Sequence, residues 1–293
     1  MQNHRDYWYT SSDGLRLYAR QYGPSDAERT IICIPGLTRN SADFAPLCEH
    51  LAGDFQIFAV DLRGRGNSDY DSKPENYHPG TYALDIIALL DQLDLNTAIL
   101  IGTSLGGLVS IVLAATAADR VTAAVINDIG PEANQTGLER IKAYVCNAKP
   151  VENWPEAIAK TKLSLSQEYP EFSDDDWLQF SNNLYRENSQ GKPILAYDPE
   201  IAVLLQTPST PEASDLWPLF NLISDLPLLL LRGELSDILS RECVTKMQQQ
   251  MPTMQFIEIP NCGHAPLLSE GSALAAIDHF LSDPRLTRPQ KLS

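Results

Sequence analysis

The sequence is poor in positive charge. Its 22 Lys and Arg residues are outnumbered by 38 Asp and Glu residues, which gives a net charge of −16 at pH 7. Nucleic acids and anionic membrane surfaces attract clustered cationic side chains, so this balance disfavours both as partners. We therefore expect a small-molecule ligand, and a protein that is a monomer or a small homo-oligomer.

Signals for export, membrane insertion and disulfide bonding are missing as well. No stretch reaches the roughly 18 consecutive apolar residues of a membrane span, and residues 1–9 lack the features of an export signal. These absences predict a cytoplasmic protein. The cysteines are odd in number and widely spaced, so they indicate incidental or buried thiols rather than a disulfide framework or a metal cluster. They are Cys33, Cys48, Cys146, Cys243 and Cys262.

Strands alternate with helices along most of the chain. Residues 6–22 are typical of a hairpin with its turn at Asp13-Gly14, and near-continuous apolar strands follow. This pattern predicts an α/β fold whose parallel sheet is covered on both faces, with functional groups at the carboxyl ends of the strands. The later strands are expected at residues 30–34, 55–60, 98–101, 123–127, 226–231 and 255–259, and helices at 41–51, 81–93, 105–118, 240–250 and 267–281.

Residues 130–215 depart from this pattern, because they contain aromatic-rich helical segments and no convincing strand. We interpret them as a helical cap inserted into a core domain of residues 1–129 and 216–282, with residues 283–293 as a loose tail. The cap aromatics predict an apolar pocket, although most are expected to pack the cap onto the core. They are Tyr144, Trp154, Tyr169, Phe172, Trp177, Phe180, Tyr185 and Tyr197.

The clearest chemical signal is the motif Gly102-Thr103-Ser104-Leu105-Gly106-Gly107. It follows an expected strand and precedes an expected helix, which is the setting of a nucleophile elbow. A strand that turns abruptly into a helix strains the serine backbone, and only glycine leaves room on either side. The motif therefore predicts Ser104 as a nucleophile, with an ordinary helix N-terminus as the alternative.

A serine nucleophile requires a base and an acid that orients the base. His264 follows an expected strand and lies on a loop, whereas the other four histidines occupy terminal, loop or helical positions. For the acid, Asp237 on the loop after residues 226–231 fits the usual chain order of nucleophile, acid and base. Asp128, after residues 123–127, is the alternative acid, and Glu234 is a further rival.

Acyl transfer also requires two preorganised donors for the oxyanion. The backbone N–H of Leu105, at the start of a helix, predicts one donor, and that of Leu37, beside a permissive glycine, predicts the other. Arg39 and Thr38 follow on the same loop and are candidate substrate-binding residues. For Arg39, an ion pair with a nearby acidic residue is an equally good interpretation, given the excess of Asp and Glu.

The motifs at residues 102–107, 61–68 and 263–264 together resemble those of the α/β hydrolase fold family, in its capped, serine-nucleophile, carboxylesterase-like branch. The resemblance covers nearly the whole chain outside the cap and tail. It implies a mostly parallel eight-stranded sheet, the triad Ser104, Asp237 and His264, and an oxyanion hole at Leu37 and Leu105. Residues 61–68 are then a supporting loop in which Arg63 and Arg65 make local ion pairs. The chain departs from the family at Pro35, where a histidine often precedes the oxyanion-loop glycine.

The predicted reaction is hydrolysis of carboxylic esters of small to medium, largely apolar substrates through an acyl-enzyme. The chemistry needs no metal and no organic cofactor. Two alternatives stay open, because the family uses the same triad more widely. One is a carbon–carbon bond or lactone hydrolase of the aromatic-degradation type. The other is a slow, receptor-like protein that binds a small ligand.

Overall fold

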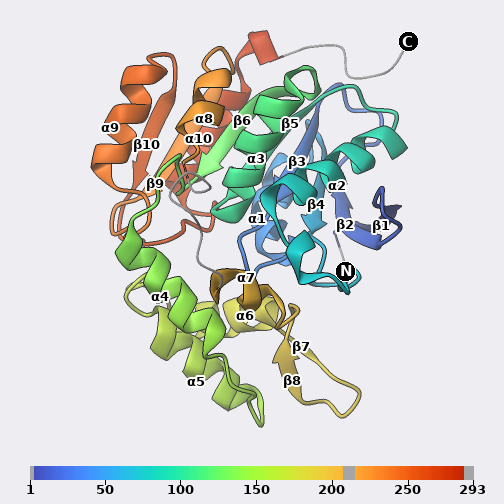
Figure 1. Cartoon of the computed structure of the whole chain (residues 1–293), viewed down its shortest axis with the longest axis vertical. Helices are drawn as coiled ribbons and strands as arrows, with labels where there is room; N and C mark the ends of the chain where they lie inside the picture. The colour runs from blue at the N-terminus through green and yellow to red at the C-terminus, as the bar shows by residue number, and fades with distance from the viewer. Residues whose placement is uncertain (1–2, 207–214, 287–293) are drawn as a thin grey trace.

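The computed structural model describes residues 3–206 and 215–286 and is built on a mixed sheet (Figure 1). The sheet has eight strands in the order β1-β2-β4-β3-β5-β6-β9-β10. Strand β2 alone runs in the direction opposite to the other strands of the sheet, so the predicted hairpin and the predicted eight-stranded, mostly parallel sheet are both confirmed. The strands are β1 (Arg5–Thr10), β2 (Arg16–Tyr22), β3 (Thr30–Ile34), β4 (Gln56–Asp61), β5 (Ala98–Thr103), β6 (Val121–Asn127), β9 (Leu228–Gly233) and β10 (Gln255–Ile259).

Helices cover both faces of this sheet, as near-continuous apolar strands require. Successive residues of a strand face opposite sides, so Ile32 and Ile34 of β3 join one buried cluster while Ile31 and Cys33 join another. The first cluster lies under α2 (Pro79–Gln92), α3 (Leu105–Thr116), α8 (Trp217–Leu222) and α9 (Arg241–Gln250). The second lies under α1 (Ala45–Leu51) and α10 (Gly271–Leu281).

A group of helices at one end of the molecule forms the region interpreted as a cap (Figure 1). It contains α4 (Gln135–Cys146), α5 (Trp154–Leu165), α6 (Asp174–Leu184) and α7 (Ile201–Gln206). It also contains a hairpin of β7 (Tyr185–Glu187) and β8 (Pro193–Leu195), so the expectation of no strand here is wrong. Strands of three residues are too short to show an alternating pattern. Residues 207–214 of the expected cap lie outside the described part of the chain.

Two differences from the sequence prediction concern the C-terminal region. Helix α10 begins at Gly271 rather than near residue 267, because residues 260–270 form the long loop that carries His264. After α10, Pro284–Leu286 form a short 3₁₀ turn, and Leu286 packs into the buried cluster beneath α10. The remaining tail residues, 287–293, are outside the described part. No helix among the described residues combines the length and apolar character needed to cross a membrane.

Candidate active site

Ser104 lies in the turn between β5 and α3 and has a strained backbone, with φ 52° and ψ −114°. The turn is tight enough that its glycines are required. A Cβ at Gly102 would overlap the carbonyl oxygen of Gly106, and a Cβ at Gly106 would overlap that of Ile34. A non-glycine residue with positive φ is uncommon and marks a position that the surrounding structure enforces. The geometry is the nucleophile elbow that the motif predicted.

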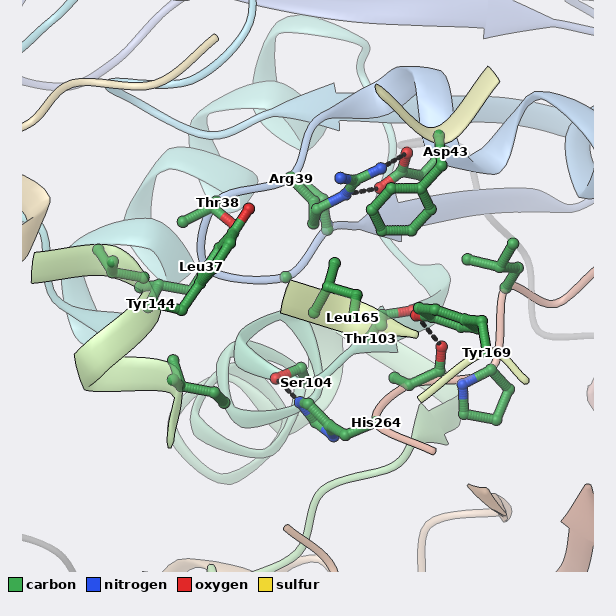
Figure 2. Close-up of a pocket in the computed structure, with 18 of the residues that line it drawn as sticks. Leu37, Thr38, Arg39, Asp43, Thr103, Ser104, Tyr144, Leu165, Tyr169 and His264 are labelled. Carbon is green, nitrogen blue, oxygen red and sulfur yellow. Dashed lines mark hydrogen bonds and ion pairs between the residues drawn. The ribbon is translucent and has the colours of Figure 1, made fainter. Parts of the chain in front are cut away.

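The imidazole of His264 lies against Ser104 (Figure 2). Ser104 Oγ is 2.7 Å from His264 Nε2, and His264 Nδ1 is 2.8 Å from Asp128 Oδ2. An ionised carboxylate accepts hydrogen bonds only, which fixes the proton of a neutral imidazole on Nδ1. Nε2 is then free to accept the Ser104 hydroxyl proton. The three side chains form one continuous chain of hydrogen bonds.

Asp128 occupies the first position after β6 and is fully buried. Its φ is 59°, which is uncommon for a non-glycine residue and shows that the chain leaves the strand conformation at this residue. The second carboxylate oxygen, Oδ1, accepts the backbone N–H of Gly233 at 3.0 Å. Both oxygens are therefore held, one by the histidine and one by β9, so the carboxylate is fixed in place.

Asp237 is not brought to His264, and its predicted place in the triad is wrong for this geometry. Its oxygens accept two hydrogen bonds from Arg140 of α4, at 2.6 and 2.7 Å. Burial raises the pKa of Asp237, but the hydrogen bonds and charge of Arg140 outweigh this effect and lower it overall. The cause lies in α4, which contacts the loop so closely at Gly137 that a Cβ there would overlap the Asp237 carbonyl oxygen. One helical turn later, Arg140 reaches the carboxylate.

Leu105 directly follows Ser104 in the chain, and Leu37 lies on the loop after β3. Leu105 is the first residue of α3, where backbone N–H groups have no acceptor within the helix. Leu37 follows Gly36, whose backbone approaches the Ser104 side chain, and Leu37 lines the same cavity as Ser104. Arg65 donates to the Leu37 carbonyl oxygen at 2.9 Å and so fixes the peptide that follows Leu37. The use of both amides as oxyanion donors stays a prediction.

Arg39 forms an ion pair with a nearby acidic residue, which was one of the two interpretations of its role. Its Nε and Nη2 each donate to Asp43 at 2.6 Å, and its guanidinium lies over the Phe180 ring, 3.9 Å from the centroid. The remaining nitrogen, Nη1, is buried and has no protein partner among the described residues. Thr38 lines the cavity beside it. A role in substrate binding stays a prediction for both residues.

A cavity of about 130 Å³ lies next to Ser104 and His264. This is small compared with the roughly 300–1,000 Å³ of sites for drug-sized ligands, and it suits a short acyl group. Three of the eight cap aromatics line it, namely Tyr144, Tyr169 and Phe180. Burial raises the pKa of Tyr144 to about 12, so its hydroxyl stays protonated at neutral pH.

The two arginines of the loop after β4 were both predicted to form ion pairs, but they have different kinds of partner. Arg63 is buried and contacts Asp13, Asp71 and Asp85 at 2.6–2.8 Å, as predicted. For Arg65 the expectation is wrong, because its hydrogen bonds go to the carbonyl oxygens of Leu37 and Arg63 and to the Tyr82 hydroxyl. Both residues support the loop and lie outside the cavity.

The residues that link the cap to the loop carrying His264 were not predicted. Arg140 and Glu168 belong to the cap region, and their partners lie about 100 residues away along the chain. Their charge was visible in the sequence, but the packing that pairs them was not. Such contacts become predictable only once the position of α4 over the sheet edge is known.

These features define the class of protein. It is an α/β protein with a serine on a strand-to-helix elbow, and this serine is hydrogen-bonded to a histidine that is itself hydrogen-bonded to a buried aspartate. The chain belongs to the alpha/beta hydrolase family, whose model matches residues 31–277.

Individual relatives agree with this assignment. The chain is 29% identical over 275 residues to a 3-hydroxybutyrate-oligomer hydrolase of Cupriavidus necator, covering 91% of this chain and 93% of the relative. It is 32% identical to a 2-(acetamidomethylene)succinate hydrolase of Mesorhizobium japonicum over 84% of this chain and 85% of the relative. The crystal structure of an alpha/beta hydrolase from Novosphingobium aromaticivorans is 41% identical, with a TM-score of 0.89, covering 96% and 99% of the two chains.

Proposed function

We propose that this protein is a serine hydrolase that cleaves carboxylic esters with short acyl groups. The observation that carries the proposal is the hydrogen-bonded chain from Ser104 through His264 to Asp128, at 2.7 and 2.8 Å. A serine alone is a weak nucleophile at neutral pH, and this arrangement supplies the base and the acid that orients it. Asp128 replaces Asp237 as the proposed acid.

The reaction proceeds in two halves. His264 Nε2 takes the Ser104 Oγ proton as Oγ attacks the ester carbonyl carbon, and the carbonyl oxygen becomes an oxyanion that accepts the Leu37 and Leu105 N–H groups. The intermediate then breaks its bond to the alkoxy oxygen, which leaves as the alcohol with the proton from His264. Water attacks the acyl-enzyme in the same way and releases the acid and free Ser104. No metal and no organic cofactor takes part.

The substrate is proposed to be a small molecule, and the cavity limits its acyl part. A volume of about 130 Å³ is sufficient for a short acyl chain. The Cupriavidus necator relative is a hydrolase of 3-hydroxybutyrate oligomers, which are short-chain esters. Oligomers of short hydroxy acids are therefore the first natural substrates to test.

A second candidate function rests on the other named relative. The Mesorhizobium japonicum protein hydrolyses 2-(acetamidomethylene)succinate, and the crystal structure of an E-2-(acetamidomethylene)succinate hydrolase has a TM-score of 0.78 and 26% identity to this chain. The same three side chains would serve hydrolysis of a small carboxylic acid that is not an ester. The two functions are distinguished by measuring the rate of hydrolysis of each substrate type under the same conditions and comparing the two rates.

The test is steady-state hydrolysis of p-nitrophenyl esters from acetate to decanoate, together with 3-hydroxybutyrate dimer and 2-(acetamidomethylene)succinate. We expect multiple turnovers, fastest on the shortest esters, and a fall in kcat on the order of 10⁶-fold in Ser104→Ala because the attacking oxygen is removed. Ser110→Ala is the matched control, since Ser110 lies in α3 and hydrogen-bonds only to its own helix at Gly106. Equal activity of Ser104→Ala and wild type would overturn the proposal. Binding of an ester with a rise in Tm but without turnover would instead support the receptor-like alternative.

A further inference from the structure

A short cap segment, Glu168 and Tyr169, is hydrogen-bonded to the loop that carries His264. The backbone carbonyl oxygen of Glu168 accepts the Gly263 N–H at 2.7 Å, and its side-chain Oε2 accepts the His264 N–H at 3.0 Å. The hydroxyl of Tyr169 donates to the Ala265 carbonyl oxygen at 2.8 Å. Three consecutive loop residues are therefore bonded to two consecutive cap residues.

The contact between the two segments is close. A Cβ at position 263 would overlap the Glu168 carboxylate, so glycine at that position is what lets the carboxylate reach the histidine backbone. Glu168 is buried, and Arg140 lies 3.3 Å from its other oxygen. Burial raises the pKa of Glu168, which the charge of Arg140 and the His264 N–H offset only in part.

The cap side of this contact is firmly supported. Tyr169 stacks on Phe172 with ring centroids 4.4 Å apart and packs edge-on against Trp177. These rings belong to a buried aromatic cluster that is completed by Phe180. Aromatic clusters of this kind hold their members in fixed orientations, so the Tyr169 hydroxyl is a well-placed donor.

The core holds the same loop at different points. Asn127 donates to the Pro266 carbonyl oxygen at 2.7 Å, and Asp128 accepts from the His264 ring. The backbone carbonyl oxygen of Cys262 accepts the Leu235 N–H at 2.9 Å. The core therefore holds the loop at residues 262 and 266 and at the imidazole, whereas the backbone hydrogen bonds of residues 263–265 go to the cap.

We propose that Glu168 and Tyr169 are positioning residues, through which the cap places the His264 backbone so that its ring reaches both Ser104 and Asp128. This inference rests on the proposed function, because it assigns a role only if His264 is the base. In this proposal the cap positions the histidine that transfers the proton, in addition to lining the cavity. Since misplacement of a reacting group by about 1 Å costs up to 10²-fold in rate, loss of the Glu168 carboxylate has a measurable effect on kcat.

The experiment measures kcat and KM on p-nitrophenyl acetate for Glu168→Ala, Glu168→Gln and Glu171→Gln. Glu168→Ala removes the acceptor, and we expect kcat to fall about 10–100-fold while KM stays within about twofold. The amide oxygen of Glu168→Gln still accepts the His264 N–H, so this variant is expected to recover activity to within about threefold of wild type. Glu171→Gln makes the same chemical change at an exposed cap residue nearby and is expected to leave both constants unchanged.

Tyr169→Phe provides a second, smaller perturbation that keeps the aromatic stack. It removes only the hydrogen bond to Ala265, and we expect a fall in kcat of about threefold with an unchanged cavity wall. Wild-type kcat in a folded Glu168→Ala, as judged by its Tm, would overturn the inference even if Ser104→Ala and His264→Ala are inactive. If those two variants keep their activity, the proposed function itself fails.

Discussion

Two aspartates follow neighbouring strands at the same edge of the sheet, yet they make opposite contacts. Asp128, after β6, is fully buried and holds the ring of His264, whereas Asp237, after β9, is about one-third exposed and pairs with Arg140. The carboxylates differ because α4 packs directly on the β9 loop and supplies a cation there.

The role of each carboxylate therefore depends on the group with which it pairs. A neutral imidazole leaves the negative charge of Asp128 available to stabilise the imidazolium that forms during proton transfer. The guanidinium of Arg140 already compensates the charge of Asp237, so this carboxylate would stabilise a second cation, such as an imidazolium, only weakly. A third buried aspartate, Asp85, extends the comparison, because it pairs with the buried cation Arg63, far from the cavity.

The largest expected effect is that of Asp128→Asn on catalysis. An amide at this position no longer fixes the proton on Nδ1 or stabilises the imidazolium, so we expect kcat to fall about 10⁴-fold, equivalent to about 5.5 kcal/mol of transition-state stabilisation. Steady-state rates on p-nitrophenyl acetate measure this directly. A fall of less than about tenfold would contradict the assignment of Asp128 as the orienting acid.

The next effect concerns stability rather than activity. Arg63→Met leaves Asp85 and Asp71 buried without their cation, and breaking a buried pair in this way costs about 3–5 kcal/mol. We expect that loss in the free energy of unfolding, measured in urea, with kcat per folded molecule unchanged. The control is Arg241→Met, which removes an exposed cation from Glu258 and is expected to cost less than about 1 kcal/mol.

The stability contributed by Arg63 is expected to depend on pH through Asp13. Hydrogen bonds from Arg63 lower the pKa of Asp13 from 3.8 to about 2. A lowered pKa in the folded state means that the stabilisation is present above pH 3.8 and is lost as the pH falls through 2. The difference in unfolding free energy between wild type and Arg63→Met should therefore narrow in acid. A difference that stays constant down to about pH 2 would show that Asp13 does not contribute.

The sequence was a good guide where the backbone alone sets the geometry. Gly102 and Gly106 specify the elbow, and the apolar runs specify the central strands, so Ser104 and the sheet were predictable. The choice between Asp128 and Asp237 was not predictable, because both follow apolar strands and the deciding contact comes from Arg140. Long-range packing of α4 therefore determines which acid meets the histidine, and no local pattern encodes it.

We expect Asp237→Asn to have little effect, which makes it the most direct test of the difference between the two aspartates. The amide can still hydrogen-bond to Arg140, and the pair is partly exposed, so we expect kcat within about threefold of wild type and a stability loss below about 1 kcal/mol. A double-mutant cycle with Arg140→Met measures the coupling between the two residues.

A coupling that appears in the unfolding free energy but not in kcat would mean that the Asp237–Arg140 pair stabilises the contact between the cap and the core. A fall in kcat for Asp237→Asn comparable to that for Asp128→Asn would instead mean that Asp237 reaches His264 during turnover. In that case α4 would have to move away from the β9 loop, because the contact at Gly137 now holds Asp237 toward Arg140. The paired measurements on the two aspartates therefore test the chemistry of the site and the position of the cap together.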